Sequence, residues 1–365
     1  MGKPLRVGVI GVGKISEQYF ASLPSLTGLE FFAVADLDSE RAKLVAEQQD
    51  VKVLTVEQLL ASPDIDVVLN LTIPAAHVEI SRRALEGGKH VYSEKPLALA
   101  PDDAVGMLAL AKSSGLRIGS APDTVLGTGV QTARALLDCG RIGDPVGASA
   151  FWSAPGHERW HPAPFFYYQP GGGPLFDMGP YYLTALVTLL GPVVWVSGSV
   201  GRSSRSRMVE TGSLAGTAIP VNIDTHVSAL LTHSSGITST VTMSFEIWAS
   251  RAPLLEVYGT LGTIAVPDPN QFCEPVQLFT SSSPEWRTAP VSAGYEHAGR
   301  GYGLADMARA IETCRPHRAS GALAFHVLEI MDAVVRAGTT ANVITVTSTV
   351  QRPELVPLGA TPSTW

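Results

Sequence analysis

The chain has 365 residues, of which 45% are hydrophobic and only 16% are charged. This composition supports a buried core and excludes a largely disordered chain, and at roughly 150 residues per domain the length predicts two domains. There are 26 basic and 33 acidic side chains, which gives a formal net charge of −7. A surface for nucleic acid or anionic membrane is therefore not expected.

Neither a membrane helix nor a signal peptide is predicted. No apolar run reaches the roughly 18 residues that a membrane helix needs, and glycines interrupt the short apolar stretch near the N-terminus. The cysteines Cys139, Cys273 and Cys314 are far apart and odd in number, which favours neither a disulfide framework nor a zinc site. We therefore expect a cytoplasmic protein without a metal centre.

Short apolar runs alternate with helical patterns over residues 1–122. The predicted strands are 5–10, 30–35, 51–54, 67–71, 90–93 and 117–120. The predicted helices run from the glycine-rich turn to about residue 23 and then over 39–49, 56–61, 77–86 and 102–114. Ser39 is the expected N-cap of the second helix. Such alternation is typical of a parallel, doubly wound sheet, so we expect an α/β domain over residues 1–122.

The pattern changes after a predicted helix at 129–139. Alternating strands are predicted over 225–232, 237–245 and 254–258, with a hairpin turn at 233–236 and a late helix over 322–337. Segments 203–217 and 353–365 have the composition of a loop and a tail. We therefore expect residues 123–365 to form an α+β domain with a mainly antiparallel sheet, one face of which can meet a partner subunit.

A glycine-rich motif, Gly11-Val12-Gly13-Lys14-Ile15-Ser16, follows the first predicted strand and opens the first helix. Backbone N–H groups at Gly11 and Gly13 can approach a pyrophosphate because no Cβ intervenes. Asp36 ends the second strand about 20 residues further on, where a carboxylate binds a ribose diol and repels a 2′-phosphate. These residues predict a dinucleotide site that prefers NAD to NADP; the alternative is a plain tight turn.

Two further strand ends carry polar residues at the same edge of the predicted sheet. Residues 70–74 (NLTIP), followed by His77, close the fourth strand, and Glu94-Lys95-Pro96 closes the fifth. Ligands bind at this carboxyl edge. A lysine that is desolvated there loses affinity for its proton and can polarise a substrate oxygen. The alternative for Lys95 is an ordinary surface lysine.

Together with a glycine-rich segment in the second half, these motifs resemble the Gfo/Idh/MocA oxidoreductases. That family takes its name from glucose–fructose oxidoreductase, inositol dehydrogenase and a rhizopine-catabolism protein. Residues 171–181 (GGGPLFDMGPY) are similar to the family's GGG-x-x-x-D-x-G-x-H segment, with Tyr181 in place of the histidine. The resemblance covers nearly the whole chain. It implies a Rossmann domain followed by an α+β domain with a large open sheet, and assembly through that sheet into a homodimer or homotetramer.

The resemblance also implies hydride transfer between a nicotinamide cofactor and a hydroxyl or keto carbon of a sugar, sugar derivative or cyclitol. Lys95 and Tyr181 are the expected catalytic residues. Lys95 polarises the substrate oxygen, and Tyr181 transfers its proton because a nearby ammonium favours the phenolate. Since several branches of the family have tyrosine at this position, trans-dihydrodiol dehydrogenase and sugar ketoreductase activities remain alternatives. A non-catalytic, cofactor-binding redox sensor is the alternative from another class.

The binding residues are predicted from the same motifs and from an aromatic segment at 156–173. The cofactor-binding set is Gly11, Gly13, Lys14, Ile15, Asp36, Thr72, Pro74, His77, Glu94 and Lys95. The substrate-binding set is Asp177, one helical turn before Tyr181, with His157, Trp160, His161 and Arg300. Aromatic rings pack on sugar C–H faces while His and Arg bond to hydroxyls. The alternatives are a helix N-cap for Asp177, a half-buried aromatic for Tyr181, and a covering loop for the aromatic segment.

Overall fold

The computed structural model describes residues 3–362, and the chain divides into two compact units. The first unit runs through Gly127 and takes in two later segments, Ala293–Phe325 and the residues from Val356 on. The second unit comprises Thr128–Ser292 and His326–Leu355. The predicted boundary between residues 122 and 123 lies close to Gly127. The predicted division into two continuous domains nevertheless assigns Ala293–Phe325 and the residues from Val356 on to the second domain, whereas both segments belong to the first unit.

The first unit contains a six-stranded parallel sheet in the order β3-β2-β1-β4-β5-β6. Its strands are β1 (Leu5–Ile10), β2 (Leu29–Ala35), β3 (Lys52–Val53), β4 (Val67–Asn70), β5 (His90–Ser93) and β6 (Ile118–Ser120). The central strands are apolar and buried on both faces; Val7, Val9, Val67 and Leu69 are all inaccessible to solvent. This is expected of parallel strands that helices cover on both sides, and it confirms the predicted doubly wound sheet.

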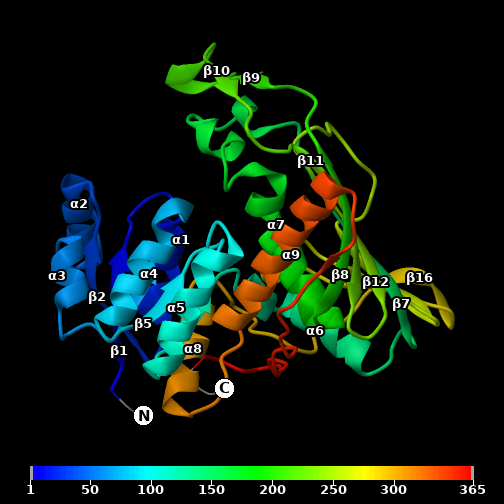
Figure 1. Ribbon diagram of the computed structural model, residues 1–365. Helices are drawn as coiled ribbons and strands as arrows, with labels where there is room; N and C mark the ends of the chain where they lie inside the picture. Colours follow the sequence, from blue (N-terminus) through cyan, green and yellow to red (C-terminus); the bar gives the residue numbers. More distant parts are fainter. Residues whose placement is uncertain (1–2, 363–365) are drawn as a thin grey trace. The chain divides into compact units, whose positions relative to one another are not determined.

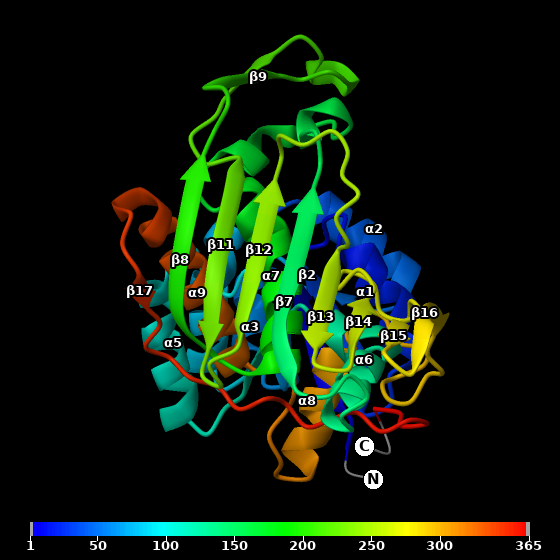
Figure 2. The same ribbon diagram turned by 90° about the vertical axis from the view of Figure 1, so that its right-hand side faces the viewer.

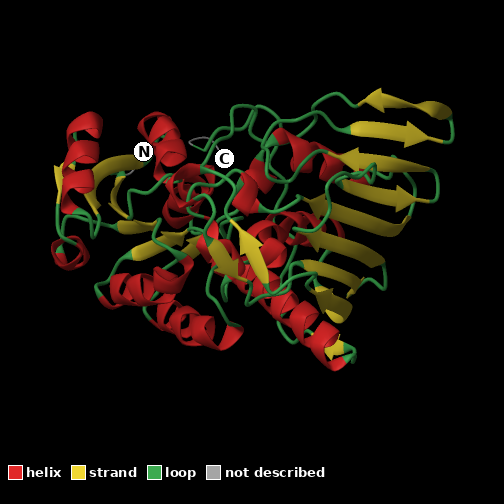
Figure 3. Ribbon diagram, turned by 90° about the horizontal axis from the view of Figure 1, so that it is seen from above, coloured by secondary structure: helices red, strands yellow, loops and turns green. Residues whose placement is uncertain are grey.

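Helices lie on both faces of this sheet, as Figure 3 shows. They are α1 (Ser16–Ser22), α2 (Ser39–Gln49), α3 (Val56–Ala61), α4 (His77–Glu86), α5 (Pro101–Ser113) and α8 (Tyr302–Glu312), with short 3-10 turns at η1 (Leu23–Ser25), η2 (Pro74–Ala76) and η3 (Thr124–Leu126). The expected N-cap Ser39 is wrong by one residue, because the carboxylate of Asp38 accepts the Arg41 N–H. The sequence patterns did not predict α8.

The second unit contains a nine-stranded sheet in the order β16-β15-β14-β13-β7-β12-β11-β8-β17. Its strands are β7 (Pro145–Ser153), β8 (Val193–Gly201), β11 (His226–His233), β12 (Thr238–Ser244), β13 (Leu255–Gly259), β14 (Gly262–Val266), β15 (Gln277–Thr280), β16 (Ser283–Thr288) and β17 (Ile344–Thr345). Only β12 and β7 pair in parallel. The predicted hairpin turn joins β11 to β12, with the His233 N–H donating to Ile237 O. The mainly antiparallel sheet is therefore confirmed.

Helices of the second unit cover one face of this sheet. They are α6 (Thr128–Asp138), α7 (Gly173–Leu190) and α9 (Gly321–Thr340), the last of which begins in the first unit. Helix α7 packs on β12, β11 and β7, and α9 packs against β8. Figure 2 shows β8, β11, β12 and β7 side by side, with no helix in front of their other face. The large open sheet implied by the resemblance is thus present.

A two-stranded arm, β9 (Ser206–Met208) paired with β10 (Ala218–Pro220), extends from one end of the second unit's sheet (Figure 1). The prediction that 203–217 is a loop is therefore wrong in part. Apolar side chains of the arm, including Ile219, pack in a small core with Tyr168 and Phe245. These contacts are distant in the sequence, so the local composition did not reveal the strands. No helix within residues 3–362 is both long and apolar enough to cross a membrane.

Two buried histidines, one in each unit, are held as neutral rings. In the second unit, His326 Nε2 lies 3.0 Å from Val193 N and accepts its N–H, which requires an unprotonated nitrogen. In the first, a ring nitrogen of His317 lies 2.9 Å from Ile118 O. Burial lowers the pKa of both rings to about 4. The folded state therefore resists protonation at a pH where an unfolded histidine already takes up a proton.

We expect the free energy of unfolding to fall as the pH drops from about 6.5, the usual pKa of histidine, to about 4. In this window the unfolded chain binds protons that the folded chain does not, and each ring contributes a loss on the order of 2–3 kcal/mol. Urea unfolding at pH 7.5 and pH 5 measures it. His326→Gln removes one titrating ring and should flatten the dependence; an unchanged slope in that variant contradicts the assignment.

Candidate functional site

The glycine-rich turn between β1 and α1 is shaped by one close backbone approach. Gly11 has a φ of +98°, and a Cβ there would stand 2.6 Å from the carbonyl oxygen of Leu71, at the end of β4. Gly13 differs, because a Cβ there would meet nothing within 4 Å. Gly11 is therefore required by the fold, whereas the space beside Gly13 is open to a ligand. Ser16 replaces a third glycine without strain, and its hydroxyl donates to Gly13 O at 2.7 Å.

Asp36, directly after β2, points its carboxylate at this turn. Its Oδ2 accepts the Val12 N–H at 2.7 Å, and its Oδ1 accepts the Asp38 N–H at 2.8 Å. Each oxygen keeps a lone pair that can accept a ribose hydroxyl. Lys14 and Arg41 both line a cavity of about 780 Å³ beside Gly13, and the Arg41 guanidinium pairs with Asp38 at 3.1 Å. The turn, the open space and the carboxylate fit a dinucleotide.

The loops after β4 and β5 are joined through His77, which is 1% exposed. Its Nδ1 lies 2.7 Å from Pro96 O and its Nε2 lies 3.0 Å from Thr72 O. Burial lowers the pKa of this ring, and a neutral imidazole donates to only one of the two carbonyls at a time. Because its ring lies between the carbonyls of Thr72 and Pro96, His77 ties the loop that carries Pro74 to the segment that carries Lys95.

Glu94 is buried, and both of its carboxylate oxygens have partners inside the first unit. Oε1 accepts the Tyr19 hydroxyl at 2.7 Å, and Oε2 accepts the Lys95 N–H at 3.0 Å. Burial and the Glu94 charge raise the pKa of Tyr19, which therefore stays a donor. No motif in the sequence indicates a role for Tyr19, since an aromatic residue in α1 gives no signal beyond core packing. Half-buried Lys95 is the second residue after β5 and follows Glu94 in the chain.

Arg300 lies in the first unit and is 6% exposed. Its Nη1 is 3.9 Å from Asp123 Oδ1, and its Nε donates to the side chain of Gln18 at 3.4 Å. The other oxygen of Asp123 accepts the N–H groups of Gly301 and Gly303 at the start of α8. The structure thus pairs Arg300 with Asp123, after β6, and with Gln18 of α1, while the other predicted substrate residues belong to the second unit.

In the second unit, α7 carries Asp177 and Tyr181 one turn apart. The helix begins at Gly173, so Asp177 lies inside it and is not an N-cap. A Cβ on Gly172 would stand 2.5 Å from Phe166 O, which explains why the chain uses glycines where the aromatic segment meets the helix. Tyr181 is 5% exposed. Both side chains have interacting partners in the structure.

The aromatic segment brings His157 to α7, and two further predicted residues, Trp160 and His161, lie beside it. His157 Nε2 lies 3.2 Å from Asp177 Oδ2. Its ring contacts Trp160, with centroids 5.0 Å apart, and the ring of His161 lies 5.3 Å from that of Trp160. Trp160 is 55% exposed and presents an aromatic face. Within the described residues, no three His, Cys, Asp or Glu side chains gather as a metal site requires.

Taken together, a parallel sheet with a glycine turn and an acidic strand end at its carboxyl edge defines a dinucleotide-binding protein. Two family models match the chain: the NAD-binding Rossmann fold of an oxidoreductase family over residues 5–121, and the GFO/IDH/MocA C-terminal domain over residues 130–265. The chain belongs to the Gfo/Idh/MocA family of oxidoreductases, as its motifs predicted, and its cofactor is a nicotinamide dinucleotide.

Named relatives act on sugars. A dTDP-3,4-didehydro-2,6-dideoxy-alpha-D-glucose 3-reductase from Actinomadura kijaniata is 32% identical over 67% of this chain and 69% of its own. A 1,5-anhydro-D-fructose reductase from Ensifer adhaerens is 28% identical over 68% of this chain and 75% of its own. Among solved structures, levoglucosan dehydrogenase in complex with NADH aligns with a TM-score of 0.80 at 21% identity, covering 95% of this chain and all of that one. At this sequence identity, the similarity to levoglucosan dehydrogenase shows a shared fold.

The two glycines of the turn should respond differently to alanine. Gly11→Ala meets the Leu71 carbonyl and an unfavourable φ, so we expect a loss of stability on the order of 2–4 kcal/mol. Gly13→Ala should leave the melting temperature unchanged and weaken NADH binding about tenfold or more, which is about 1.4 kcal/mol. Thermal melts and NADH fluorescence titrations measure both. Wild-type NADH affinity in Gly13→Ala would exclude a close approach of the pyrophosphate there.

Proposed function

We propose that this protein oxidises a hydroxyl carbon, or reduces the corresponding keto carbon, of an uncharged sugar, sugar derivative or cyclitol. The single observation that carries the proposal is the first part of α7. There Asp177 and Tyr181 stand one turn apart, and His157 contacts Asp177. A carboxylate, a phenol and exposed aromatic faces are groups that recognise polyols. Membership of a family that contains dehydrogenases and reductases supports hydride transfer as the type of reaction.

The proposed roles follow from the chemistry of each side chain. Lys95 polarises the substrate oxygen, and the Tyr181 hydroxyl takes or returns its proton. Asp177, His157 and His161 orient the substrate hydroxyls, while Trp160 covers a C–H face of the ring. The nicotinamide, when bound by the first unit, supplies or accepts the hydride. The protein's own contribution is therefore position and electrostatics.

The charges of the aromatic segment and the arm favour an uncharged substrate over a nucleotide sugar. Arg207 pairs with Glu158 at 2.8 Å and with Glu246 at 2.7 Å, while Arg159 pairs with Glu210. These carboxylates neutralise both guanidinium groups, which therefore do not offer a site for a diphosphate. The relatives include both nucleotide-sugar and free-sugar enzymes, so this local charge balance supports the second group.

A panel of free sugars, cyclitols and dTDP-sugars, monitored at the NADH absorbance, tests the proposal. We expect kcat/KM to be higher for a member of the uncharged group than for any nucleotide sugar. A higher value for a dTDP-sugar would overturn the substrate class and leave the reaction type intact. Tight NADH binding without turnover across the panel would instead favour the redox sensor.

Lys95→Met and Tyr181→Phe should each lower kcat by about 10² to 10⁴, the usual contribution of a positioned acid or base. NADH affinity should barely change in Tyr181→Phe, which removes only a hydroxyl. The double variant should be little worse than the poorer single one if the two groups act as a unit. Tyr182→Phe removes a neighbouring hydroxyl of α7 and serves as the control. Wild-type kcat and an unchanged pH profile in Tyr181→Phe would contradict Tyr181 as the acid or base. His157 or His161 would then be the candidate for proton transfer.

We further propose NAD as the preferred cofactor. The Asp36 carboxylate supports it, as does the ion pair in which Asp38 holds Arg41. Asp36→Ser should lower kcat/KM with NAD about 10- to 100-fold, since hydrogen bonds to a charged group contribute about 1.5–3 kcal/mol. The value with NADP should fall less or rise. Asp103→Ser, an exposed change in α5, controls for a lost charge, and a wild-type preference for NADP would contradict the proposal.

We also propose that the open face of the nine-stranded sheet pairs with a second copy of the chain. The face carries many hydroxyl groups, with Leu230 and Trp195 exposed among serines and threonines. An open sheet face of this kind can pair isologously with a second copy. Light scattering at micromolar concentration should give the mass of a dimer or tetramer. A stable monomer would exclude this mode of assembly.

A further inference from the structure

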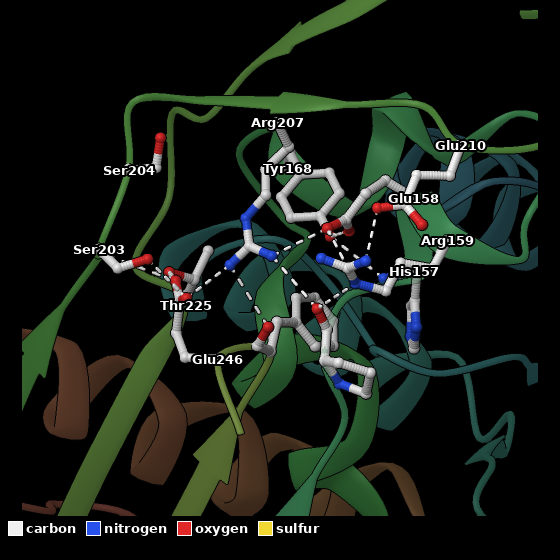
Figure 4. A network of polar contacts seen from close by, with 12 residues as sticks. His157, Glu158, Arg159, Tyr168, Ser203, Ser204, Arg207, Glu210, Thr225 and Glu246 are labelled. Atoms are coloured by element: carbon white, nitrogen blue, oxygen red, sulfur yellow. Dashed lines mark hydrogen bonds and ion pairs between the residues drawn. The ribbon is translucent and has the colours of Figure 1, made fainter. Parts of the chain in front are cut away.

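The turn that carries His157 is clamped by a side chain from the arm, as the close-up in Figure 4 shows. Arg207, in β9, donates through Nη1 to Glu158 Oε1 at 2.8 Å and to Pro155 O at 3.3 Å. Its Nη2 pairs with Glu246 Oε2 at 2.7 Å. Arg207 therefore binds the chain on both sides of His157. The Glu158 side chain is 2% exposed and Arg207 is 11% exposed, so water does not compete for these bonds.

A second link runs from the same carboxylate to the backbone of His157. The Tyr168 hydroxyl donates to Glu158 Oε2 and accepts the His157 N–H at 3.1 Å. Burial and the Glu158 charge raise the pKa of Tyr168, which therefore stays a donor. Gly156 has a φ of +113°, and a Cβ there would stand 2.2 Å from Glu158 Oε2. Only glycine lets the turn close this tightly over the carboxylate.

The ring of His157 has one polar partner among the described residues. Its Nε2 faces Asp177 Oδ2 at 3.2 Å, whereas its buried Nδ1 has no hydrogen-bond partner within residues 3–362. The rings of Tyr167 and Phe245 lie against it, with centroids 4.3 and 4.5 Å away. A neutral imidazole carries one N–H. Because the only acceptor near the ring among the described residues faces Nε2, the proton is placed on Nε2. His157 therefore donates to Asp177.

We propose that Arg207, Glu158 and Tyr168 are positioning residues for the reaction: they hold His157 so that its Nε2–H orients the Asp177 carboxylate toward the substrate. The inference rests on the proposed function and adds a role for the arm, which supplies Arg207. In this arrangement His157 acts on the substrate through Asp177. The other Asp177 oxygen then meets the substrate in a fixed direction, one helical turn before Tyr181.

Tyr168→Phe is the sharpest test, because it deletes one oxygen and breaks the link between Glu158 and the His157 N–H. We expect kcat to fall about 10- to 100-fold, the scale of a small misplacement of a reacting group, while the Kd for NADH stays within twofold. Tyr182→Phe is the matched control: its hydroxyl also donates to a carboxylate oxygen, that of Asp268 rather than Glu158, at 3.2 Å. It should keep the wild-type kcat.

The second readout is the NMR signal of the His157 Nε2–H, assigned by its loss in His157→Gln. It should be present in the wild type and in Tyr182→Phe, and lost or displaced in Tyr168→Phe. Should Tyr168→Phe fail to fold, Arg207→Lys, which cannot span Pro155 and Glu158 together, is read in the same way. An unchanged signal in the folded variant overturns the proposal whatever the rate. If the wild type turns over no sugar, the proposed function fails, and the signal still decides the positioning.

Discussion

The site of the first unit depends on a close approach of backbone to backbone. A Cβ on Gly11 would lie 2.6 Å from Leu71 O and 2.9 Å from Thr72 N, so the end of β1 can meet the end of β4 only where there is no side chain. That approach brings the glycine turn beside the loop that carries Thr72. His77 continues the connection, since its ring spans from Thr72 O to Pro96 O. The carboxyl ends of β1, β4 and β5 thus form one connected surface, and Lys95 follows the last of them.

In the second unit, a similar close approach of two backbone segments occurs at the start of α7. Gly172 packs against the carbonyl of Phe166, where a Cβ would be only 2.5 Å away, and the helix begins at the next residue. The aromatic segment therefore enters the helix without a gap, and Asp177 and Tyr181 occupy its first turns. Both units therefore use glycine to bring two backbone segments together.

Two carboxylates, Glu94 and Glu158, are buried and paired inside the molecule. Burying an ion costs desolvation energy, which attraction offsets only where hydrogen bonds satisfy the remaining polar atoms. Around Glu158 that condition holds, because Arg207 and the Tyr168 hydroxyl occupy its two oxygens. Glu94 is satisfied in the same way by Tyr19 and the Lys95 N–H.

Local patterns in the sequence were sufficient for the strands of the first sheet, for most of its helices and for the family. The helix over 56–61 was predicted to the residue, because its capping box at Thr55 and Gln58 is local, and the glycine turn, Asp36, the Glu94-Lys95-Pro96 segment and the triple glycine identified a nicotinamide oxidoreductase. Only the tertiary structure decided which polar side chains are held internally. Tyr19 meets Glu94 across 75 positions and Arg207 meets Glu158 across 49, while Arg300 is buried near Asp123. The physical reason is that a side chain's role depends on its burial and its partner, and both are set by segments that meet only in the folded chain.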